Sequence, residues 1–297
     1  MRIGLISVPM DLGADRRGVD MGASAIRYTN LDEKLRALGH EVINLDPVAV
    51  SEPETRSPGE PRLKYLEQIV AASEQLAMRV KACLDDGAIP VTLGGDHSVA
   101  LGSISGAAGV YKRLGVIWID AHADFNTDET SPSGNIHGMI LAALAGLGDS
   151  RLVNVGGAGP HVSPQRIAIV GAREIDPDEQ RLLREQHVHV WTMSDIDRRG
   201  MEAVFSDALR VATDDADGLH VSFDLDAVDP TEAPGVGTPV PGGITYREAQ
   251  LAMEMVAESG KLTSLDMVEV NPILDRENRT AILACELALS AFGKRIF

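Results

Sequence analysis

The chain has 297 residues, of which 44% are hydrophobic, so it is long and apolar enough to bury a full globular core. Its 44 acidic and 27 basic residues give a formal net charge of -17, which disfavours nucleic acid and anionic membrane surfaces as partners. A solvated acidic surface explains most of this charge, and a cationic substrate would benefit from it. No apolar run approaches the length of a transmembrane span.

The chain opens on a strand-like run, "MRIGLISVP", without the long apolar stretch and small-residue cleavage site of a secretory signal. The two cysteines, Cys83 and Cys285, stand inside apolar helical patterns, and we interpret them as buried hydrophobic residues without a disulfide framework. A reducing cytoplasm is therefore the expected location.

Short β-rich runs alternate with amphipathic stretches along the whole chain. In order, the runs are "IGLISV", "EVINL", "AIPVTLGG", "LGVIWIDA", "QRIAIVGA", "VHVWT", "GLHVSFDLD" and "LTSLDMVEV". This alternation predicts βαβ units around a central, mostly parallel sheet. The central runs are apolar on both faces, as is typical of buried parallel strands.

Two helices have well-marked ends. The first is predicted over Pro61–Asp86, where apolar residues recur on one stripe and Gly87 follows as a C-terminal stop. The second is predicted to begin at Thr245, which has capping-box spacing to Glu248, and to end at Gly260. The apolar faces of such helices are expected to cover the sheet.

Two segments look irregular: "AVSEPETRSPGEPR" near residue 55 and "NVGGAGPHVSPQ" near residue 160. Strand and helix units of the same kind continue on both sides of each segment, so neither indicates an interdomain linker. The stretch "GGAGPH" precedes a strand and does not open a helix, which favours a glycine-rich loop over a phosphate-binding loop. We predict a single domain over residues 1–297.

Carboxylate and imidazole side chains follow three of the predicted strands. "VTLGG" runs into Asp96 and His97, "VIWI" into Asp120, His122 and Asp124, and "HVSF" into Asp224 and Asp226. Ligands bind outside the carboxyl ends of strands in open α/β sheets, so these strand ends form the candidate site. Side chains two apart in extended chain point the same way, so we expect the members of each alternating set to converge.

Four carboxylates in one small volume would take up protons unless cations balanced their charge. Taken singly, each motif is explained equally well by helix capping or by a turn, but three strand ends together predict two divalent metals. Carboxylate and imidazole without thiolate favour Mn²⁺, with Co²⁺, Ni²⁺, Fe²⁺ or Zn²⁺ able to compete. We interpret His220 as a hydrogen-bonded core histidine, and the remaining histidines without carboxylate neighbours as structural or surface residues: His40, His161, His187 and His189.

Longer blocks of the sequence resemble the arginase family of ureohydrolases, and its bacterial members in particular. The blocks are "GGDHS" (94–98), "DAHADFNT" (120–127), "SGNIHG" (133–138), "SFDLDAVDPTEAPGVGTPVPGG" (222–243), "EVNP" (269–272) and the N-terminal "VPMDLGADRRGVDMGASAIR". The resemblance spans essentially the whole chain. It implies a three-layer α/β/α sandwich and a homo-trimer or homo-hexamer.

The resemblance also implies a cluster of two Mn²⁺ per chain. The implied ligands are His97, Asp120, His122, Asp124, Asp224 and Asp226. Asp120 and Asp224 would bridge the two ions. His97 and Asp124 would complete the shell of one ion, and the other two ligands would complete that of its neighbour.

The implied reaction is manganese-dependent hydrolysis of L-arginine to L-ornithine and urea by a metal-bridging hydroxide. Glu269 would accept paired hydrogen bonds from the guanidinium group, and His137 would shuttle a proton or assist the departing amine. Asp124 is counted with these two as catalytic. An ordinary loop histidine is the alternative interpretation of His137.

The substrate contacts implied by the resemblance are Asn126, Ser133 and Asn135 for the α-carboxylate, Asp176 for the α-ammonium group, and Thr238 near the guanidinium. Ordinary turn chemistry explains the two asparagines, Ser133 and Thr238 as well, and the role of Glu174 is left open. Two alternative functions remain: a sister ureohydrolase acting on agmatine or a guanidino acid, and a catalytically idle binding protein. The substrate-end residues argue against the first, and the complete set of ligands argues against the second.

Overall fold

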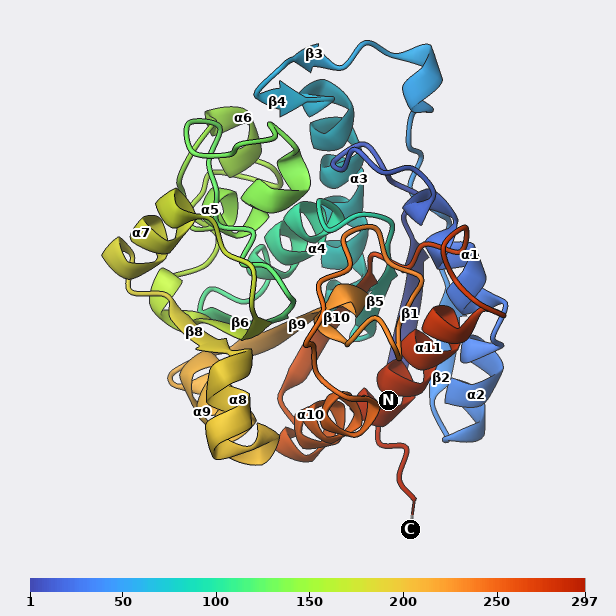
Figure 1. The fold of residues 1–297 in the computed structure, drawn as a ribbon. Coiled ribbons are helices and arrows are strands. Elements are labelled where there is room, and N and C mark those ends of the chain that lie inside the picture. Colours follow the sequence, from blue (N-terminus) through green and yellow to red (C-terminus); the bar gives the residue numbers. More distant parts are fainter. Residues whose placement is uncertain (297) are drawn as a thin grey trace.

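In the computed structural model, which describes residues 1–296, eight strands form one parallel sheet with helices on both faces (Figure 1). The strands are β1 (Arg2–Ser7), β2 (Glu41–Asn44), β5 (Ile89–Leu93), β6 (Leu114–Ile119), β7 (Ile167–Ala172), β8 (His189–Thr192), β9 (Gly218–Asp224) and β10 (Leu262–Val268). Their order is β2-β1-β5-β10-β9-β6-β7-β8, and every neighbouring pair is parallel. The predicted α/β/α sandwich and its strands are confirmed.

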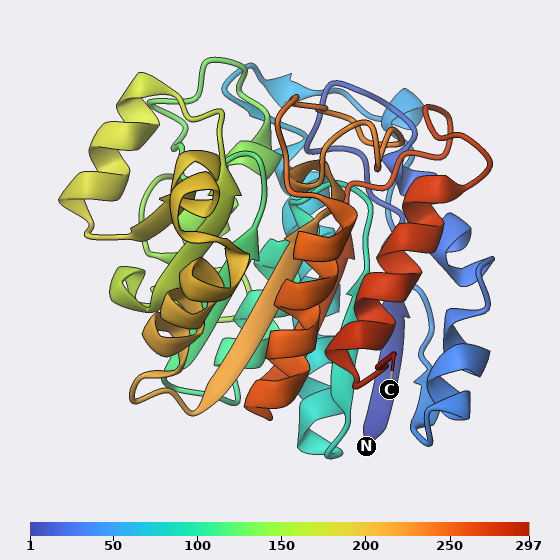
Figure 2. The ribbon, with the colours of Figure 1, turned by 60° about the horizontal axis from the view of Figure 1, so that its bottom comes forward.

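The helices divide between two apolar clusters, one on each face of the sheet. One cluster contains residues of α1 (Gly22–Arg27), α2 (Leu31–Ala37), α8 (Met193–Arg199), α9 (Met201–Thr213), α10 (Tyr246–Ser259) and α11 (Arg279–Ala291). The other contains residues of α3 (Leu66–Asp85), α4 (Val99–Ala108), α5 (Ile140–Leu144), α6 (Ser150–Val153) and α7 (Pro177–Glu185). Figure 2 looks onto α10 and α11, which lie in front of the sheet.

The strands at the centre of the sheet are apolar because both of their faces are covered. Every residue of β6, β7 and β9 is buried. Trp118 of β6, Phe223 of β9, Phe125 and Phe205 are among the largest fully buried side chains. Burial on both faces explains why these strands read as unbroken β-rich runs instead of alternating ones.

The helix predicted over Pro61–Asp86 begins later than expected. α3 starts at Leu66, and the residues before it form an antiparallel hairpin of β3 (Gly59–Glu60) and β4 (Leu63–Lys64). Tyr65 joins hairpin and helix with a left-handed backbone, φ 55°, which a right-handed helix cannot include. The prediction is therefore wrong for residues 61–65, which form the turn of the hairpin, its second strand and the junction to α3.

The second predicted helix, α10, is confirmed at both ends. Thr245 accepts the N–H of Glu248 at 3.3 Å, and the Glu248 carboxylate accepts the N–H of Thr245 at 2.8 Å, which completes the capping box. Gly260 ends the helix with φ 61°, a left-handed conformation that glycine adopts without steric cost.

Both cysteines are buried and free, and burial raises the pKa of the Cys83 thiol to about 11.

Among residues 1–296, no helix is both long and apolar enough to cross a membrane.

Four adjacent central strands, β5, β10, β9 and β6, deliver polar residues to the same edge of the sheet. His97 follows β5, Asp120 follows β6, Asp224 ends β9, and Glu269 follows β10. Because all four strands are parallel, their carboxyl ends meet, and these residues gather although they are distant in sequence.

Candidate metal centre and substrate pocket

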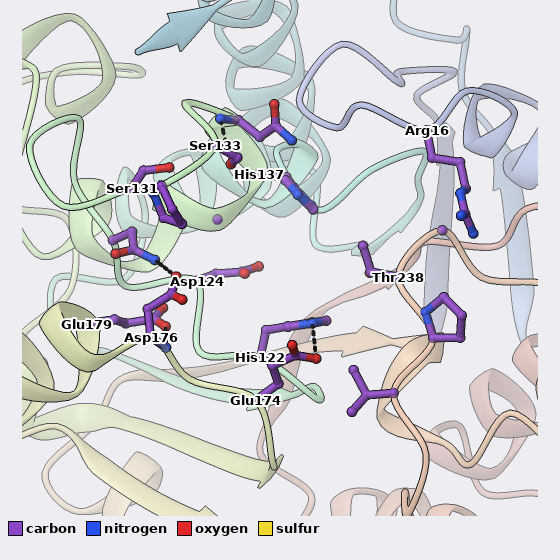
Figure 3. Close-up of a pocket in the computed structure, with 17 residues that line it drawn as sticks. Arg16, His122, Asp124, Ser131, Ser133, His137, Glu174, Asp176, Glu179 and Thr238 are labelled. Atoms are coloured by element: carbon purple, nitrogen blue, oxygen red, sulfur yellow. Dashed lines mark hydrogen bonds and ion pairs between the residues drawn. The ribbon is translucent and has the colours of Figure 1, made fainter.

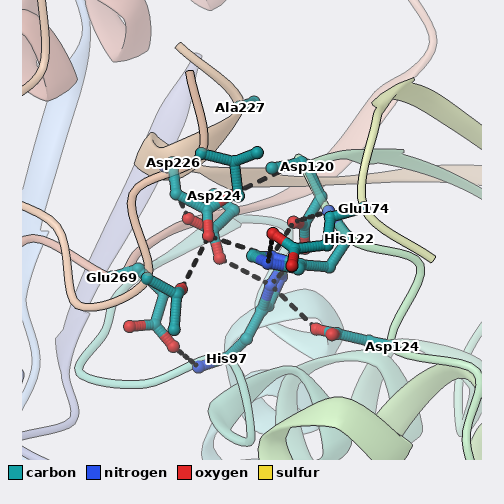
Figure 4. A network of polar contacts seen from close by, with 12 residues as sticks. His97, Asp120, His122, Asp124, Glu174, Asp224, Asp226, Ala227 and Glu269 are labelled. Carbon is teal, nitrogen blue, oxygen red and sulfur yellow. Dashed lines mark hydrogen bonds and ion pairs between the residues drawn. The ribbon is translucent and has the colours of Figure 1, made fainter. Parts of the chain in front are cut away.

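The imidazole of His97 faces three carboxylates. Its Nδ1 lies 3.0 Å from Asp120 Oδ2, 3.1 Å from Asp224 Oδ2 and 3.4 Å from Asp124 Oδ2 (Figure 4). Its Nε2 contacts Ser222 Oγ at 2.8 Å, whereas Nδ1 is buried and has no hydrogen-bond partner within the described part of the chain. A buried ring nitrogen aimed at carboxylates, with its other nitrogen hydrogen-bonded, is the arrangement typical of a metal-ligating histidine.

A second group of ligand atoms shares Asp120 with the first. The Nδ1 of His122 lies 3.3 Å from Asp120 Oδ1 and 3.1 Å from Asp226 Oδ2. Within each of the groups His97–Asp120–Asp224 and Asp120–His122–Asp226, one ligand atom per residue lies within 4.8 Å of the others. The geometry therefore supports a bridging position for Asp120, and the bridging role of Asp224 stays a prediction.

Tight turns bring these residues together. β6 ends at Ile119, and beyond it the N–H of His122 donates to Asp120 Oδ1 at 2.7 Å. After β9, the N–H of Asp226 donates to Asp224 Oδ1 at 2.7 Å inside a short helical turn. Alternation along an extended strand is therefore only part of the cause: Asp224 still belongs to β9, whereas Asp120 and His122 lie beyond β6, where an aspartate side chain folds the backbone.

Burial and crowding shift the pKa values of the cluster. Burial raises the pKa of Asp224 and of Asp124 well above the usual range, and neighbouring carboxylates raise both further. Burial also acts to raise the pKa of Asp120, but the adjacent imidazoles of His122 and His97 hold it well below its usual range. Burial lowers the pKa of His122, and nearby aspartates more than offset it, so the net shift is upward. This excess of buried negative charge fits two divalent cations.

Asp96, which precedes His97, serves the loops around the cluster. It is completely buried and accepts the N–H of Gly13 at 2.8 Å and that of Ser98 at 2.9 Å. Burial, followed by the charge of Glu269, raises the pKa of Asp96 to about 6. Its contacts tie the N-terminal loop to the segment between β5 and α4.

Glu269 and His137 face each other beside the cluster. Glu269 is 1% exposed and has a left-handed backbone, φ 65°, which is uncommon for a residue other than glycine. Its Oε1 accepts the N–H of His97 at 2.9 Å and lies 3.4 Å from His137 Nδ1. Burial lowers the pKa of His137, but the hydrogen bond and charge of Glu269 raise it overall. The other oxygen of Glu269 faces Gly237, which has no side chain to fill the space beside it.

A cavity of about 550 Å³ opens over the cluster (Figure 3). Its lining includes the candidate ligands His122 and Asp124 together with His137, Asn126, Ser133, Asn135, Asp176 and Thr238. All the predicted substrate-binding residues except Glu269 therefore line this cavity. Glu269 lies just behind this lining, in contact with His137.

The neutral polar groups of the lining have their acceptor atoms occupied by the protein. Asn126 Oδ1 accepts the hydroxyl of Thr130 at 2.9 Å, and Asn126 Nδ2 donates to Asp176 Oδ2 at 3.1 Å. Ser133 Oγ accepts the N–H of Asn135 at 3.2 Å. An amide and a hydroxyl whose acceptors are used keep donor hydrogens for an anionic ligand.

Arg173 anchors the segment that carries Thr238. Its guanidinium donates to the main-chain carbonyls of Asp226 at 2.7 Å, Ala227 at 3.0 Å and Val240 at 2.6 Å. The hydroxyl of Thr238 in turn donates to Asp226 Oδ2 at 2.9 Å. Nothing in the local sequence indicates this role of Arg173, because its partners lie far along the chain.

Several lining residues escaped the sequence predictions, among them Arg16, Ser131 and Glu179. Glu179 closes the capping box of α7 with Asp176 and accepts the N–H of Phe125 at 2.7 Å. Burial raises the pKa of Glu179 to about 7. The capping-box spacing in "DPDE" is a signal that could have revealed Glu179, whereas no comparable signal exists for the other two.

Comparisons with known proteins agree with this geometry. The sequence profile of the Arginase family matches residues 1–293. The chain is 48% identical to the arginase of Bacillus caldovelox over 99% of both chains. The native structure of the Bacillus caldovelox arginase has a TM-score of 0.97 at 47% identity and 99% coverage of each chain. The structure of Entamoeba histolytica arginase in complex with L-ornithine has a TM-score of 0.91 at 33% identity, again with 99% of each chain covered.

Proposed function

The chain belongs to the arginase family and is a hydrolase, and we propose that it hydrolyses L-arginine to L-ornithine and urea. The observation that carries the proposal is that two kinds of side chain line a single cavity. One part of its wall is a cluster of imidazole and carboxylate groups, and another part presents amide and hydroxyl donors. Such a cavity matches a substrate with a guanidinium group at one end and an α-amino acid at the other.

We propose that two Mn²⁺ ions are held by the six predicted ligands: His97, Asp120, His122, Asp124, Asp224 and Asp226. The donor set of carboxylate oxygen and imidazole nitrogen supports a hard or borderline ion. Bound there, such ions would supply Lewis-acid chemistry that makes water a competent nucleophile toward the guanidinium carbon at neutral pH.

Glu269 is proposed to grip the guanidinium. One of its oxygens is held by the N–H of His97, so the carboxylate cannot rotate freely, and the other faces the space beside Gly237. A fixed carboxylate can accept hydrogen bonds from two guanidinium nitrogens and orient the electrophilic carbon.

His137 is proposed to hold the proton that the departing amine needs. Its contact with Glu269 favours the charged imidazolium, and its place in the cavity lining puts it within reach of the substrate. The amine of ornithine is a poor leaving group without a proton, so general acid catalysis is required at this point.

At the amino-acid end, we propose that Asn126, Ser133 and Asn135 bind the α-carboxylate and that Asp176 receives the α-ammonium group. Asn126 Oδ1 and Ser133 Oγ already accept hydrogen bonds from the protein, which supports donor roles for these two side chains. Donors suit this end because the α-carboxylate loses its hydration on entering a site lined with acidic side chains, and hydrogen bonds from neutral groups replace that hydration.

The proposal is tested by measuring urea release from L-arginine, agmatine and guanidino acids with the manganese-loaded protein. We expect arginine to be strongly preferred, because amine substrates leave the carboxylate donors unpaired, at about 1–3 kcal/mol for each buried polar group. Equal activity on agmatine would assign the chain to a sister reaction, and no release from any of the three would support an idle binding protein.

A homo-trimer or homo-hexamer and a cytoplasmic location are also proposed. The assembly is supported by the family membership, and the location by two buried free cysteines.

A further inference from the structure

The β3–β4 hairpin packs directly on the segment that carries Ser133 and Asn135. The backbone N–H of Lys64 donates to the carbonyl of Gly134 at 3.2 Å. Gly134 has φ 72°, and a Cβ at this position would lie 2.1 Å from the carbonyl oxygen of Pro61. The guanidinium of Arg62, between the two strands of the hairpin, also donates to the main-chain carbonyls of Asp128 and Glu129. Hairpin and segment therefore fit together backbone against backbone.

The side chain of Lys64 continues this contact to the substrate end of the cavity. Its Nζ donates to Asn135 Oδ1 at 2.9 Å and to Asp15 Oδ1 at 2.8 Å. An ammonium group can only donate, so it holds the carbonyl end of the Asn135 amide toward itself. The NH₂ end of the amide helps to lower the pKa of Asp15 through one hydrogen bond, so its second N–H is left for another acceptor. Asn135 itself is 8% exposed and lines the cavity.

The terminal torsion of asparagine is broad and roughly two-fold, so without the ammonium group nothing on this side fixes which end of the amide faces it. The rotated amide would present its oxygen to the α-carboxylate of the substrate, and two acceptors would then face each other. Asp15 balances the charge of Lys64 at short range, so the hydrogen bond to Asn135, and not net charge, is the main effect expected of this lysine.

We propose that Lys64 is a positioning residue for substrate selection: it turns the amide of Asn135 so that its remaining N–H meets the α-carboxylate of an amino-acid substrate. The inference rests on the proposed function and deepens it. It makes the hairpin, which lies outside the cavity lining, part of the discrimination between arginine and its decarboxylated analogue.

The test compares Lys64→Met with wild type, using the manganese-loaded protein. We expect KM for arginine to rise about ten- to hundredfold, the loss typical of a hydrogen bond to a charged group, while kcat changes less than about threefold. The inhibition constant of L-ornithine should rise by a similar factor, and that of putrescine, which lacks the carboxylate, should stay unchanged. Lys64→Arg, which keeps donor groups, should restore most of the affinity for ornithine.

Lys81→Met is the matched control, because Lys81 also pairs with an aspartate, Asp85, at 2.6 Å on the exposed side of α3. It should leave all constants at wild-type values. Thermal unfolding and metal content of each variant show whether Lys64→Met still folds and loads. If it does not fold, Lys64→Gln and Lys64→Arg provide the same comparison.

A double-mutant cycle with Asn135→Ala separates positioning from general support. If Lys64 acts through Asn135, adding Lys64→Met to the Asn135→Ala variant should change KM less than about twofold. Additive effects, or equal losses for ornithine and putrescine, would overturn the inference. Absence of urea release from arginine by wild type would defeat the proposed function instead, and ornithine binding measured by calorimetry would still decide the role of Lys64.

Discussion

Asp120 holds a special place among the cluster residues, because its two oxygens face different histidines. Oδ2 lies toward His97 and Oδ1 toward His122. Trp118 of β6 donates its indole N–H to Asp120 Oδ2 at 2.9 Å, and this hydrogen bond helps to fix the orientation of the carboxylate. Asp120 belongs to both ligand groups, so its loss would weaken metal binding at both, whereas His122 belongs to only one group.

We predict that chelation abolishes urea release and that Mn²⁺ restores it at about two ions per chain, as a two-metal site requires. Asp120→Ala should retain less metal than His122→Ala, since it removes a ligand from both groups. Metal content after dialysis, measured by mass spectrometry, checks this order, with Asp85→Ala as an exposed control. Wild-type metal content in Asp120→Ala would contradict the shared position.

His137→Ala should lower kcat by about 10²–10⁴-fold and keep both metals, because general acid–base groups contribute in this range. His161→Ala is a suitable control: His161 is also partly buried, but its Nε2 contacts the carbonyl of Val153 at 3.1 Å, away from the cavity lining. Steady-state kinetics and metal content together check the prediction. Loss of metal from His137→Ala would make this histidine a ligand.

At the scale of elements, side-chain hydrogen bonds fix the segment between β9 and α10 at two places along its length. Arg173 donates to the carbonyls of Ala227, near the start of the segment, and Val240, near its end. Asp229 accepts the hydroxyl of Thr231 at 2.6 Å and the backbone N–H groups of Gly242 at 2.8 Å and Gly243 at 3.2 Å. The hydrogen bond from Thr231 and the backbone donors lower the pKa of Asp229 to about 2.

This lowered pKa predicts a pH-dependent contribution to stability. The folded state prefers ionised Asp229, so its contribution is complete above the ordinary carboxyl pKa of about 4 and is lost as pH falls toward 2. Asp229→Asn should lower the free energy of unfolding by about 1 kcal/mol at neutral pH, a value reduced for the partial exposure of the group. The difference from wild type should shrink between about pH 4 and pH 2.

Denaturant unfolding of both proteins across this pH range checks the expectation. Asp197→Asn, on the exposed side of α8, provides a control that should show neither effect. A difference between wild type and Asp229→Asn that stays constant down to pH 2 would show that charge is not the cause.

At the scale of the whole molecule, one sheet separates the two apolar clusters, which supports the proposal that residues 1–297 form one domain. Some large apolar side chains nevertheless remain exposed on the single chain. Ile273 is 66% exposed and Ile282 is 45% exposed, both close to the start of α11. Singly exposed apolar side chains are common on monomers, so the family membership is the support for the proposed assembly.

We predict that light scattering coupled to size-exclusion chromatography gives three or six times the chain mass of 31.7 kDa. The measurement is best repeated over a range of protein concentrations, since a weak assembly would dissociate on dilution. A mass of one chain at every concentration would contradict both proposed assemblies.

The strands and the ends of α10 could be predicted from the sequence, because their signals are local. Apolar runs, capping-box spacing and the stop at Gly260 all lie within the element that they define. The candidate ligands could be predicted for a related reason: each strand end carries its own polar residues, and parallel strands bring their carboxyl ends together. The boundary of α3 could not, since helical periodicity does not reveal the hairpin before it.

Other features were decided only by the tertiary structure. Lys64 and Asn135 are 71 positions apart, and Arg173 and Val240 are 67 apart, so neither pair leaves a local pattern. Even the convergence of Asp120 with His122 depends on a turn whose hydrogen bond forms after the strand has ended. Sequence patterns reflect hydrogen bonds within one segment and the burial of its apolar face. The orientation of a side chain at the site depends instead on which distant segment packs against it.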